Sequence, residues 1–338
     1  MTKIKVGVVG LGHLGRHHIR IYSELKEAEL IGGYDIDRAL AEERCGALGT
    51  VPFSSYEELL NEIDALNIVV PTVSHYEVAL PALKRGIHVL IEKPISRTVE
   101  EADSLIKEAK KQNCVLQVGH IERFNRAMRA VRNLDIQPLF IESQRLAPFN
   151  PRGTDVSVVH DLMIHDVDIV LSFVRSPLER IDAVGARVVS RHEDIANARL
   201  RFKNGCVANI TASRIARKRI RKMRIFQHDT YIHLDFAEGR TELFRLIDGD
   251  TVSQNEGTIC REFGQVELGA QGKRILLEHP AIEENGDALT LELKSFLHAI
   301  GTGGPPLVSG EDGRQALDVV HRIIEGAHEH AADVHNLF

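Results

Sequence analysis

At 338 residues the chain is longer than one hydrophobic core usually organises, and this length predicts two domains. Hydrophobic residues make up 43% of it and charged residues 27%, a balance that is typical of globular proteins and excludes a disordered chain. Acidic residues outnumber lysine plus arginine by 48 to 42, so the net charge gives no general attraction to nucleic acid or to anionic membranes. No signal-like segment or apolar stretch of 18 residues is found, and we expect a cytoplasmic protein without nucleic-acid or membrane partners.

The first 120 residues alternate short β-branched runs with helical patterns, which is typical of a parallel sheet wound with crossover helices. Thr98 and Glu101 have the spacing of a capping box and predict the start of one of these helices. Strands are expected over residues 4–9, 29–35, 65–70, 88–92 and 115–119. Residues 1–120 are therefore predicted to form a Rossmann domain.

Beyond residue 120 the pattern changes to successive strands separated by turn residues. Lys203-Asn204-Gly205 lies between two strand-like segments and is a strong signal for a β-hairpin. A loop rich in glycine and proline precedes Ser309, which we expect to cap a last helix. The predicted fold class is α/β: a Rossmann parallel sheet, followed over residues 121–338 by a substrate-binding α+β domain on a large, mainly antiparallel sheet with a C-terminal helix.

A glycine-rich turn directly follows the first expected strand and opens a helix. Its residues are Gly10, Leu11, Gly12, His13, Leu14 and Gly15. In this setting Gly10 permits a tight turn, Gly12 lets the backbone approach a pyrophosphate, and Gly15 lets helix and strand pack closely. We therefore predict that these residues bind the phosphates of a dinucleotide through backbone amides, the alternative being a plain glycine turn.

Asp35 ends the second expected strand, 20 residues after Gly15. An acidic side chain here can accept hydrogen bonds from both ribose hydroxyls of the adenosine half, and it would repel a 2′-phosphate. Asp35 therefore favours NAD over NADP. The alternative is that Asp35 and Asp37 only form a turn, in which case Arg38 leaves room for NADP.

Several motifs follow the later strands or precede the last helix. They are Pro71-Thr72 with His75, Glu92-Lys93-Pro94, Val118-Gly119 followed by Arg123-Phe124-Asn125, and residues 307–313. Together they resemble the glucose-fructose oxidoreductase, inositol dehydrogenase and MocA (Gfo/Idh/MocA) family of dehydrogenases over nearly the whole chain. The carboxyl ends of parallel strands line the ligand crevice of open α/β sheets, so the cofactor-binding set is extended to Pro71, Thr72, His75, Glu92 and Lys93.

The resemblance implies that Lys93 lies beside the nicotinamide and the substrate hydroxyl, and that the bond before Pro94 is cis. A solvated surface lysine is the alternative for Lys93. The family also implies an NAD(P)-dependent dehydrogenase that acts on CH–OH groups and forms a homodimer or homotetramer.

Asp161, His165 and Asp168 recur at i, i+4 and i+7 in a helical pattern over residues 156–173, which places them on one face. A structural histidine is the alternative interpretation. The D-x-x-x-H spacing resembles the catalytic helix of the family, which implies His165 as the base and Asp161 as the group that orients the substrate or the imidazole. Lys93 would stabilise the developing alkoxide. Asp168, Arg123 and Asn125 are expected to bind substrate.

Seven cationic side chains lie within residues 214–224 of this otherwise acidic chain. Either solvent screens them on an exposed strand edge, or an anion neutralises some of them. The segments VGHIERFN and DLMIHDVDIVLSFV resemble the family branch that oxidises UDP-N-acetylglucosamine at C3, as in lipid A precursor synthesis. Arg214 and Arg217 are therefore expected to bind a diphosphate, because arginine makes bidentate contacts with phosphate.

Two alternatives to this function are a free polyol or sugar dehydrogenase of the inositol type and a non-catalytic NAD-binding sensor. The four cysteines are widely spaced, and the 17 histidines form no H-E-x-x-H or comparable ligand spacing. We therefore expect neither a metal nor a disulfide framework.

Overall fold

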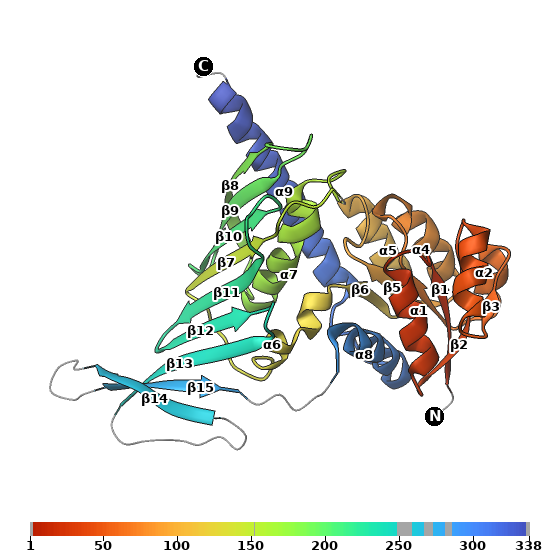
Figure 1. Ribbon diagram of the computed structural model, residues 1–338, viewed down its shortest axis with the longest axis horizontal. Coiled ribbons are helices and arrows are strands. Elements are labelled where there is room, and N and C mark those ends of the chain that lie inside the picture. Colours follow the sequence, from red (N-terminus) through yellow and green to blue (C-terminus); the bar gives the residue numbers. More distant parts are fainter. Residues whose placement is uncertain (1–2, 152, 249–258, 267–272, 281–285, 336–338) are drawn as a thin grey trace. The chain divides into compact units, whose positions relative to one another are not determined.

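The computed structural model describes residues 3–151, 153–248, 259–266, 273–280 and 286–335. Their contacts group the chain into two compact units (Figure 1). The first unit combines Met1–Ile121 with Gly286–Asp318, and the second combines Glu122–Asn285 with Val319–Phe338. Among the described residues, no helix is long and apolar enough to cross a membrane.

The first unit contains a six-stranded parallel sheet in the order β3-β2-β1-β4-β5-β6, which confirms the predicted Rossmann arrangement. Its strands are β1 (Ile4–Val9), β2 (Ala28–Tyr34), β3 (Val51–Pro52), β4 (Ala65–Ile68), β5 (His88–Glu92) and β6 (Leu116–Gly119). Its helices are α1 (Gly15–Glu24), α2 (Arg38–Gly46), α3 (Tyr56–Leu60), η1 (Thr72–Ser74), α4 (His75–Lys84), α5 (Val99–Lys111) and α8 (Ala288–Thr302). The sequence did not predict β3, because a two-residue edge strand is too short to show alternation.

Residues 286–318 pack with the first unit, whereas the predicted boundary placed them in the second domain. Helix α8 contributes Leu293, Phe296 and Leu297 to the hydrophobic core that α1 and β1 share. The chain then runs beside β6, where the Val118 amide donates to the Val308 carbonyl at 3.1 Å. Burial of these apolar side chains, which occur far along the sequence, explains the return of the chain to the first unit.

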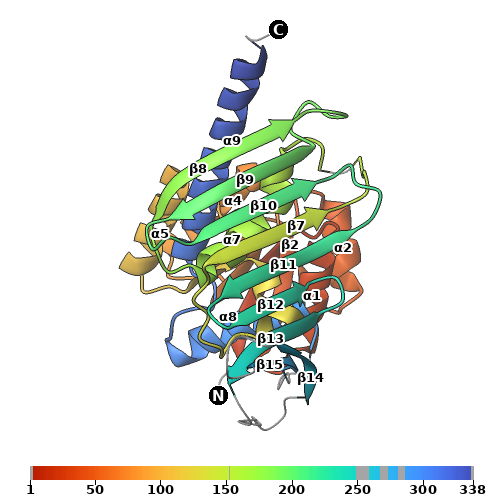
Figure 2. The ribbon, with the colours of Figure 1, turned by 90° about the vertical axis from the view of Figure 1, so that its left-hand side faces the viewer.

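The second unit contains a nine-stranded sheet in the order β14-β15-β13-β12-β11-β7-β10-β9-β8, seen face-on in Figure 2. The strands are β7 (Phe140–Leu146), β8 (Leu178–Ala186), β9 (Ile195–Phe202), β10 (Val207–Ser213), β11 (Ile220–Gln227), β12 (Thr230–Asp235), β13 (Arg240–Asp248), β14 (Ile259–Val266) and β15 (Lys273–His279). All neighbouring pairs are antiparallel except β7 and β10, so the mainly antiparallel prediction is confirmed.

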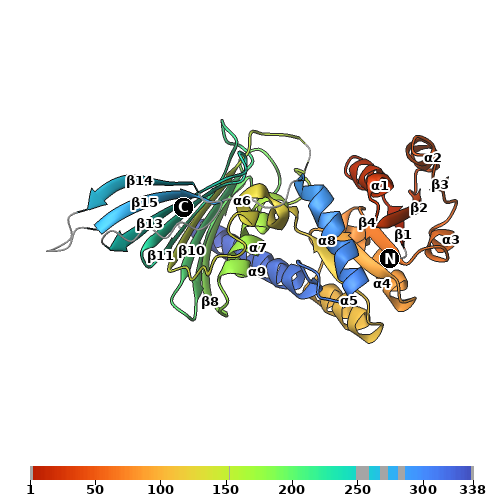
Figure 3. The ribbon, with the colours of Figure 1, turned by 90° about the horizontal axis from the view of Figure 1, so that it is seen from below.

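Short helices cover one face of this sheet. They are η2 (Ile121–Phe124), α6 (Arg126–Arg129), η3 (Val159–Met163) and α7 (Ile164–Phe173), and α6 contacts β12 and β13 while α7 contacts β7 and β10 (Figure 3). The predicted C-terminal helix is α9 (Gly310–His335), and the boundary of the two units falls within it. The predicted hairpin joins β9 to β10 through Gly205, whose φ of +89° requires glycine.

Candidate functional site

The glycine turn after β1 has a backbone that other residues could not adopt. A Cβ on Gly10, where φ is +86°, would lie 2.3 Å from the Val69 carbonyl oxygen, and one on Gly15 would lie 1.8 Å from the Gly10 carbonyl oxygen. Around Gly12, in contrast, no atom lies within 4 Å of the Cβ position. This open approach to the backbone fits the role expected for Gly12 at a pyrophosphate.

The N-terminus of α1 is suited to an anion. Its N-cap is Leu14, which makes no side-chain hydrogen bond to the first turn, and the side chains of His13 and Leu14 are exposed. The amides of Arg16 and His17, in the first turn of α1, already donate to the Gly12 and Leu14 carbonyls. The amides of the glycine turn before them are therefore the candidates for donation to phosphate oxygens. The Leu11 side chain, by contrast, is fully buried in the core.

Asp35 connects the glycine turn to the end of β2. Its carboxylate accepts hydrogen bonds from the Leu11 amide at 2.7 Å and from the Asp37 amide at 2.9 Å. Each carboxylate oxygen retains a further acceptor site, so the half-buried group can still accept from ribose hydroxyls. The turn and the carboxylate are therefore suited to the roles predicted for them at the phosphates and the adenosine ribose of NAD.

His75 lies between the chain segments that follow β4 and β5. Its Nδ1 lies 2.8 Å from the Pro94 carbonyl oxygen and its Nε2 lies 2.9 Å from the Val70 carbonyl oxygen. Burial lowers the pKa of the ring despite these two carbonyls. A backbone carbonyl lies within hydrogen-bond distance of each ring nitrogen, so His75 connects the segments that hold Val70 and Pro94. The cofactor contact expected for His75 stays a prediction. Pro71 precedes η1, which begins at Thr72.

Glu92, at the end of β5, belongs to a chain of polar contacts within the first unit. Its Oε1 lies 3.3 Å from Nε2 of His18, whose Nδ1 lies 2.8 Å from Oδ1 of Asn67. Burial alone would raise the pKa of Glu92, but the hydrogen bond from His18 and the charges of His18 and Lys93 lower it. The half-buried Lys93 precedes Pro94 through a cis peptide bond, as the resemblance implied.

In the second unit, Asp161 and His165 lie across a junction of two helix types. Asp161 belongs to the π-helix η3, and His165 is the second residue of the α-helix α7. The single helical face predicted over residues 156–173 is therefore interrupted, because a π-turn is wider than an α-turn. Such turns frequently occur at functional sites. Both side chains are half-buried, whereas Asp168 is fully buried.

Three residues that were predicted to bind substrate make contacts within the second unit. Arg123 forms a bidentate ion pair with Asp168, with N–O distances of 2.6 and 2.9 Å, and these side chains are 13% and 1% exposed. Asn125 caps α6 through the Ala127 amide and donates to Glu122 at 2.9 Å. A buried charge must be paired, and this requirement explains the ion pair of Arg123 with Asp168. Substrate binding by these residues stays a prediction.

Arg145 is a buried arginine that was not predicted from the sequence, and it pairs with Asp166, the residue after His165. Arg145 on β7 contacts Asp166 at 2.6 Å and Glu122 at 2.7 Å, and Ser143 donates to Asp166 at 2.7 Å. Arg145 occupies an inward position of the alternating strand FIESQRL, a placement that demands a buried acidic partner. Asp166 and Asp168 thus fix the helix immediately after His165.

The cationic segment divides into three groups. Arg214 forms the first group and donates to the Gly153 and Val156 carbonyls. The second group makes ion pairs with carboxylates: Arg221 with Glu122 at 3.7 Å, Lys222 with Asp235 at 3.3 Å and Arg224 with Glu142 at 2.6 Å. The third group, Arg217, Lys218 and Arg219, is exposed on the loop between β10 and β11 and makes no hydrogen bond or ion pair within the described residues. Since β11 lies between β12 and β7, the exposed-edge interpretation is wrong.

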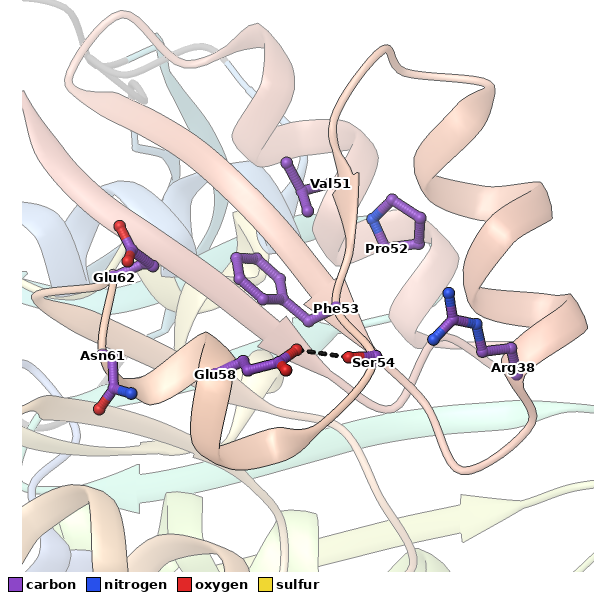
Figure 4. A pocket seen from close by; sticks show the side chains of 8 residues that line it. All are labelled: Arg38, Val51, Pro52, Phe53, Ser54, Glu58, Asn61 and Glu62. Atoms are coloured by element: carbon purple, nitrogen blue, oxygen red, sulfur yellow. Dashed lines mark hydrogen bonds between the residues drawn. The ribbon is translucent and has the colours of Figure 1, made fainter.

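A pocket of about 400 Å³ lies beside the edge strand β3 (Figure 4). It is lined by Arg38, Val51, Pro52, Phe53, Ser54, Glu58, Asn61 and Glu62, none of which belongs to the glycine turn. Arg38 is the residue whose charge was considered compatible with NADP. Its Nε donates to Glu42 at 2.8 Å, so this arginine has an acidic partner. Where the structure describes His, Cys, Asp and Glu side chains, no group of three or more is arranged for a metal ion.

Two family models match the chain. The model of an oxidoreductase family with an NAD-binding Rossmann fold matches residues 4–120, and the model of the GFO/IDH/MocA C-terminal domain matches residues 128–233. The UDP-N-acetylglucosamine 3-dehydrogenase of Acidithiobacillus ferrooxidans is 36% identical over 318 residues, covering 94% of this chain and 95% of that protein. The myo-inositol 2-dehydrogenase of Thermotoga maritima is 29% identical over 332 residues, covering 93% of each chain.

Solved structures agree with these matches. A structure of the Acidithiobacillus enzyme has a TM-score of 0.84 at 34% identity and covers 96% of this chain and 98% of its own. A levoglucosan dehydrogenase in complex with NADH and levoglucosan has a TM-score of 0.79 at 20% identity and covers 97% and 98%. Because the levoglucosan dehydrogenase is only 20% identical, its similarity shows a shared fold and nothing about function.

Proposed function

Because this chain belongs to the Gfo/Idh/MocA family of NAD-binding oxidoreductases, we propose that it oxidises C3 of a UDP-N-acetylglucosamine-type nucleotide sugar. One observation carries the proposal: the 36% identity to an enzyme of that name extends over 94% of this chain, which includes the second unit. The inositol-type alternative rests on the 29% identity to a myo-inositol dehydrogenase over a similar share of the chain.

The proposed chemistry uses three side chains. Bound NAD would supply a hydride acceptor at C4 of its nicotinamide. His165 removes the proton of the substrate hydroxyl, and Lys93 stabilises the negative charge that develops on the same oxygen. Asp161 orients the hydroxyl or the imidazole. A non-catalytic sensor would need the glycine turn and Asp35 but none of these three side chains, so their presence argues for an enzyme.

Arg217, Lys218 and Arg219 are proposed to bind the diphosphate of the substrate. They are exposed, and within the described residues they have no acidic partner, whereas Arg221, Lys222 and Arg224 are neutralised by carboxylates. We expect the Arg217→Ala variant to raise KM for a UDP-sugar with little change in kcat, because ground-state phosphate binding is lost. Arg180→Ala is the matched control, since Arg180 is exposed on β8 and pairs with Asp182.

The proposal is tested by measuring NADH formation with UDP-N-acetylglucosamine, free N-acetylglucosamine and myo-inositol. We expect turnover on the nucleotide sugar and competitive inhibition by UDP alone. Efficient oxidation of myo-inositol, together with no inhibition by millimolar UDP, would overturn the nucleotide-sugar assignment in favour of the inositol type. Tight NAD binding with only slow oxidation of every sugar would instead favour the sensor.

A further inference from the structure

Arg214 directly follows β10 and is almost completely buried, with 4% of its surface exposed. Its Nη1 donates to the Gly153 carbonyl at 2.6 Å and its Nη2 donates to the Val156 carbonyl at 2.7 Å. Its own amide donates to the Asp194 carbonyl at 2.9 Å, so the arginine backbone is itself held in place. Hydrogen bonds from a charged donor are short and strong. The guanidinium therefore joins both ends of the turn formed by residues 153–156, and it faces carbonyls rather than the phosphate we expected.

This turn lies directly on the Asp161 carboxylate. Gly153 has a φ of +79°, and a Cβ at this position would lie 3.2 Å from Oδ2 of Asp161. The positive φ favours glycine, and the Cβ of any other residue would press on the Asp161 carboxylate. Arg214, Gly153 and Asp161 all belong to the second unit, which fixes their contacts independently of the first.

We infer that Arg214 is a positioning residue, which holds residues 153–156 against Asp161 and so sets the direction of that carboxylate toward the substrate. The inference rests on the proposed role of Asp161. A displacement of about 1 Å at a reacting or orienting group can cost roughly 10²-fold in rate, so two hydrogen bonds remote from the substrate can influence turnover.

Two independent variants disturb the turn. Arg214→Met removes both donors from the carbonyls, and Gly153→Ala places a methyl group against the Asp161 carboxylate. We expect each to lower kcat for sugar oxidation by roughly 10-fold to 100-fold. The affinity for NAD, measured by calorimetry, should stay within about twofold of the unaltered protein, because the NAD-binding residues belong to the first unit.

Gly205→Ala is the matched control. Gly205 has a φ of +89°, so alanine meets a similar backbone strain there, but no atom lies within 4 Å of its Cβ position. This variant should lose stability comparably to Gly153→Ala and keep its kcat. If the two glycine variants reduce kcat equally, backbone strain alone explains the effect and the inference is overturned.

A double variant separates positioning from general damage. If Arg214 and Gly153 act on one turn, Arg214→Met combined with Gly153→Ala should lower kcat no further than the more severe single variant, whereas independent effects would multiply. Asp161→Asn separates the proposed role of Asp161 from the positioning role of Arg214. Full turnover by Asp161→Asn refutes the proposed role of Asp161 itself. Loss of turnover by Asp161→Asn, with unchanged kcat in Arg214→Met and Gly153→Ala, refutes the positioning role alone.

Discussion

Asp35 accepts amide hydrogen bonds from Leu11 and Asp37 and places a negative charge where the adenosine ribose is expected. Replacing it with serine should narrow the preference for NAD over NADP by about tenfold, or ~1.4 kcal/mol, because the repulsion of a 2′-phosphate is removed. Calorimetric titration of both cofactors measures the ratio. Asp37→Ser is the control, since Asp37 caps α2 through the Leu40 amide. Tighter binding of NADP than of NAD by the unaltered protein would contradict the role of Asp35.

Lys93 and His165 are proposed to act at the reacting hydroxyl, so their loss should lower turnover and leave cofactor binding intact. We expect Lys93→Met and His165→Asn each to lower kcat by ~10² to 10⁴, the usual cost of removing a general acid or base. NAD affinity should be nearly unchanged in both. Turnover of His165→Asn near that of the unaltered protein at every pH would mean that His165 is not the base.

At the level of elements, Arg145 joins β7 to the segments that carry Glu122 and Asp166. Arg145→Met removes the cation that contacts the buried Asp166, and it removes the nearer of the two cations that contact Glu122. We expect a loss of about 3–5 kcal/mol in the free energy of unfolding. Arg180→Met breaks the exposed pair with Asp182 and should cost at most about 1 kcal/mol. Urea unfolding of both variants measures the difference. Equal losses in the free energy of unfolding would show that the buried ion pairs of Arg145 stabilise the fold no more than the exposed pair of Arg180 does.

Glu292 on α8 makes stability depend on pH in the opposite sense to most carboxylates. Among the described residues, neither of its carboxyl oxygens has a hydrogen-bond partner, and burial, reinforced by the charge of Glu92, raises its pKa well above the ordinary 4.5. The folded protein keeps this group protonated while the unfolded chain ionises. The stability contribution of Glu292 is therefore fully present below about pH 4.5 and is lost as the pH rises toward the folded-state pKa.

Glu292→Gln should consequently be more stable than the unaltered protein at neutral pH, and the advantage should shrink as the pH falls toward 4.5. Thermal unfolding across this range measures the difference. Glu62→Gln, at an exposed position, should show no such pH dependence. An advantage of Glu292→Gln that is constant with pH would mean that Glu292 is ionised in the folded state.

At the level of the whole molecule, the first unit is made from two separated stretches of chain. A fragment of residues 1–121 lacks Leu293, Phe296 and Leu297 of its core, so we expect it to show no cooperative thermal unfolding. Joining residues 286–318 to it through a flexible glycine-serine linker should restore cooperative unfolding and NAD binding. Cooperative unfolding of the shorter fragment would show that α8 is dispensable for this core.

Several features were predictable from the sequence because they depend on neighbours a few residues away. The glycine turn needs only its own backbone geometry, the capping box of Thr98 and Glu101 spans one helical turn, and the Gly205 hairpin spans two strand ends. Strand positions in the first unit followed from short apolar runs that alternate with helical patterns. The same local patterns, with the family resemblance, led to an NAD-binding dehydrogenase.

Only the tertiary structure decided which polar groups meet. Arg123 and Asp168 are 45 residues apart, and Arg214 lies 61 residues from Gly153, so no local pattern distinguishes a substrate-binding arginine from an internal one. The return of residues 286–318 to the first unit is equally non-local. Sequence patterns indicate which charged residues will be buried and so need a partner, because an unpaired buried charge costs too much free energy. Packing in the tertiary structure then decides which residue that partner is.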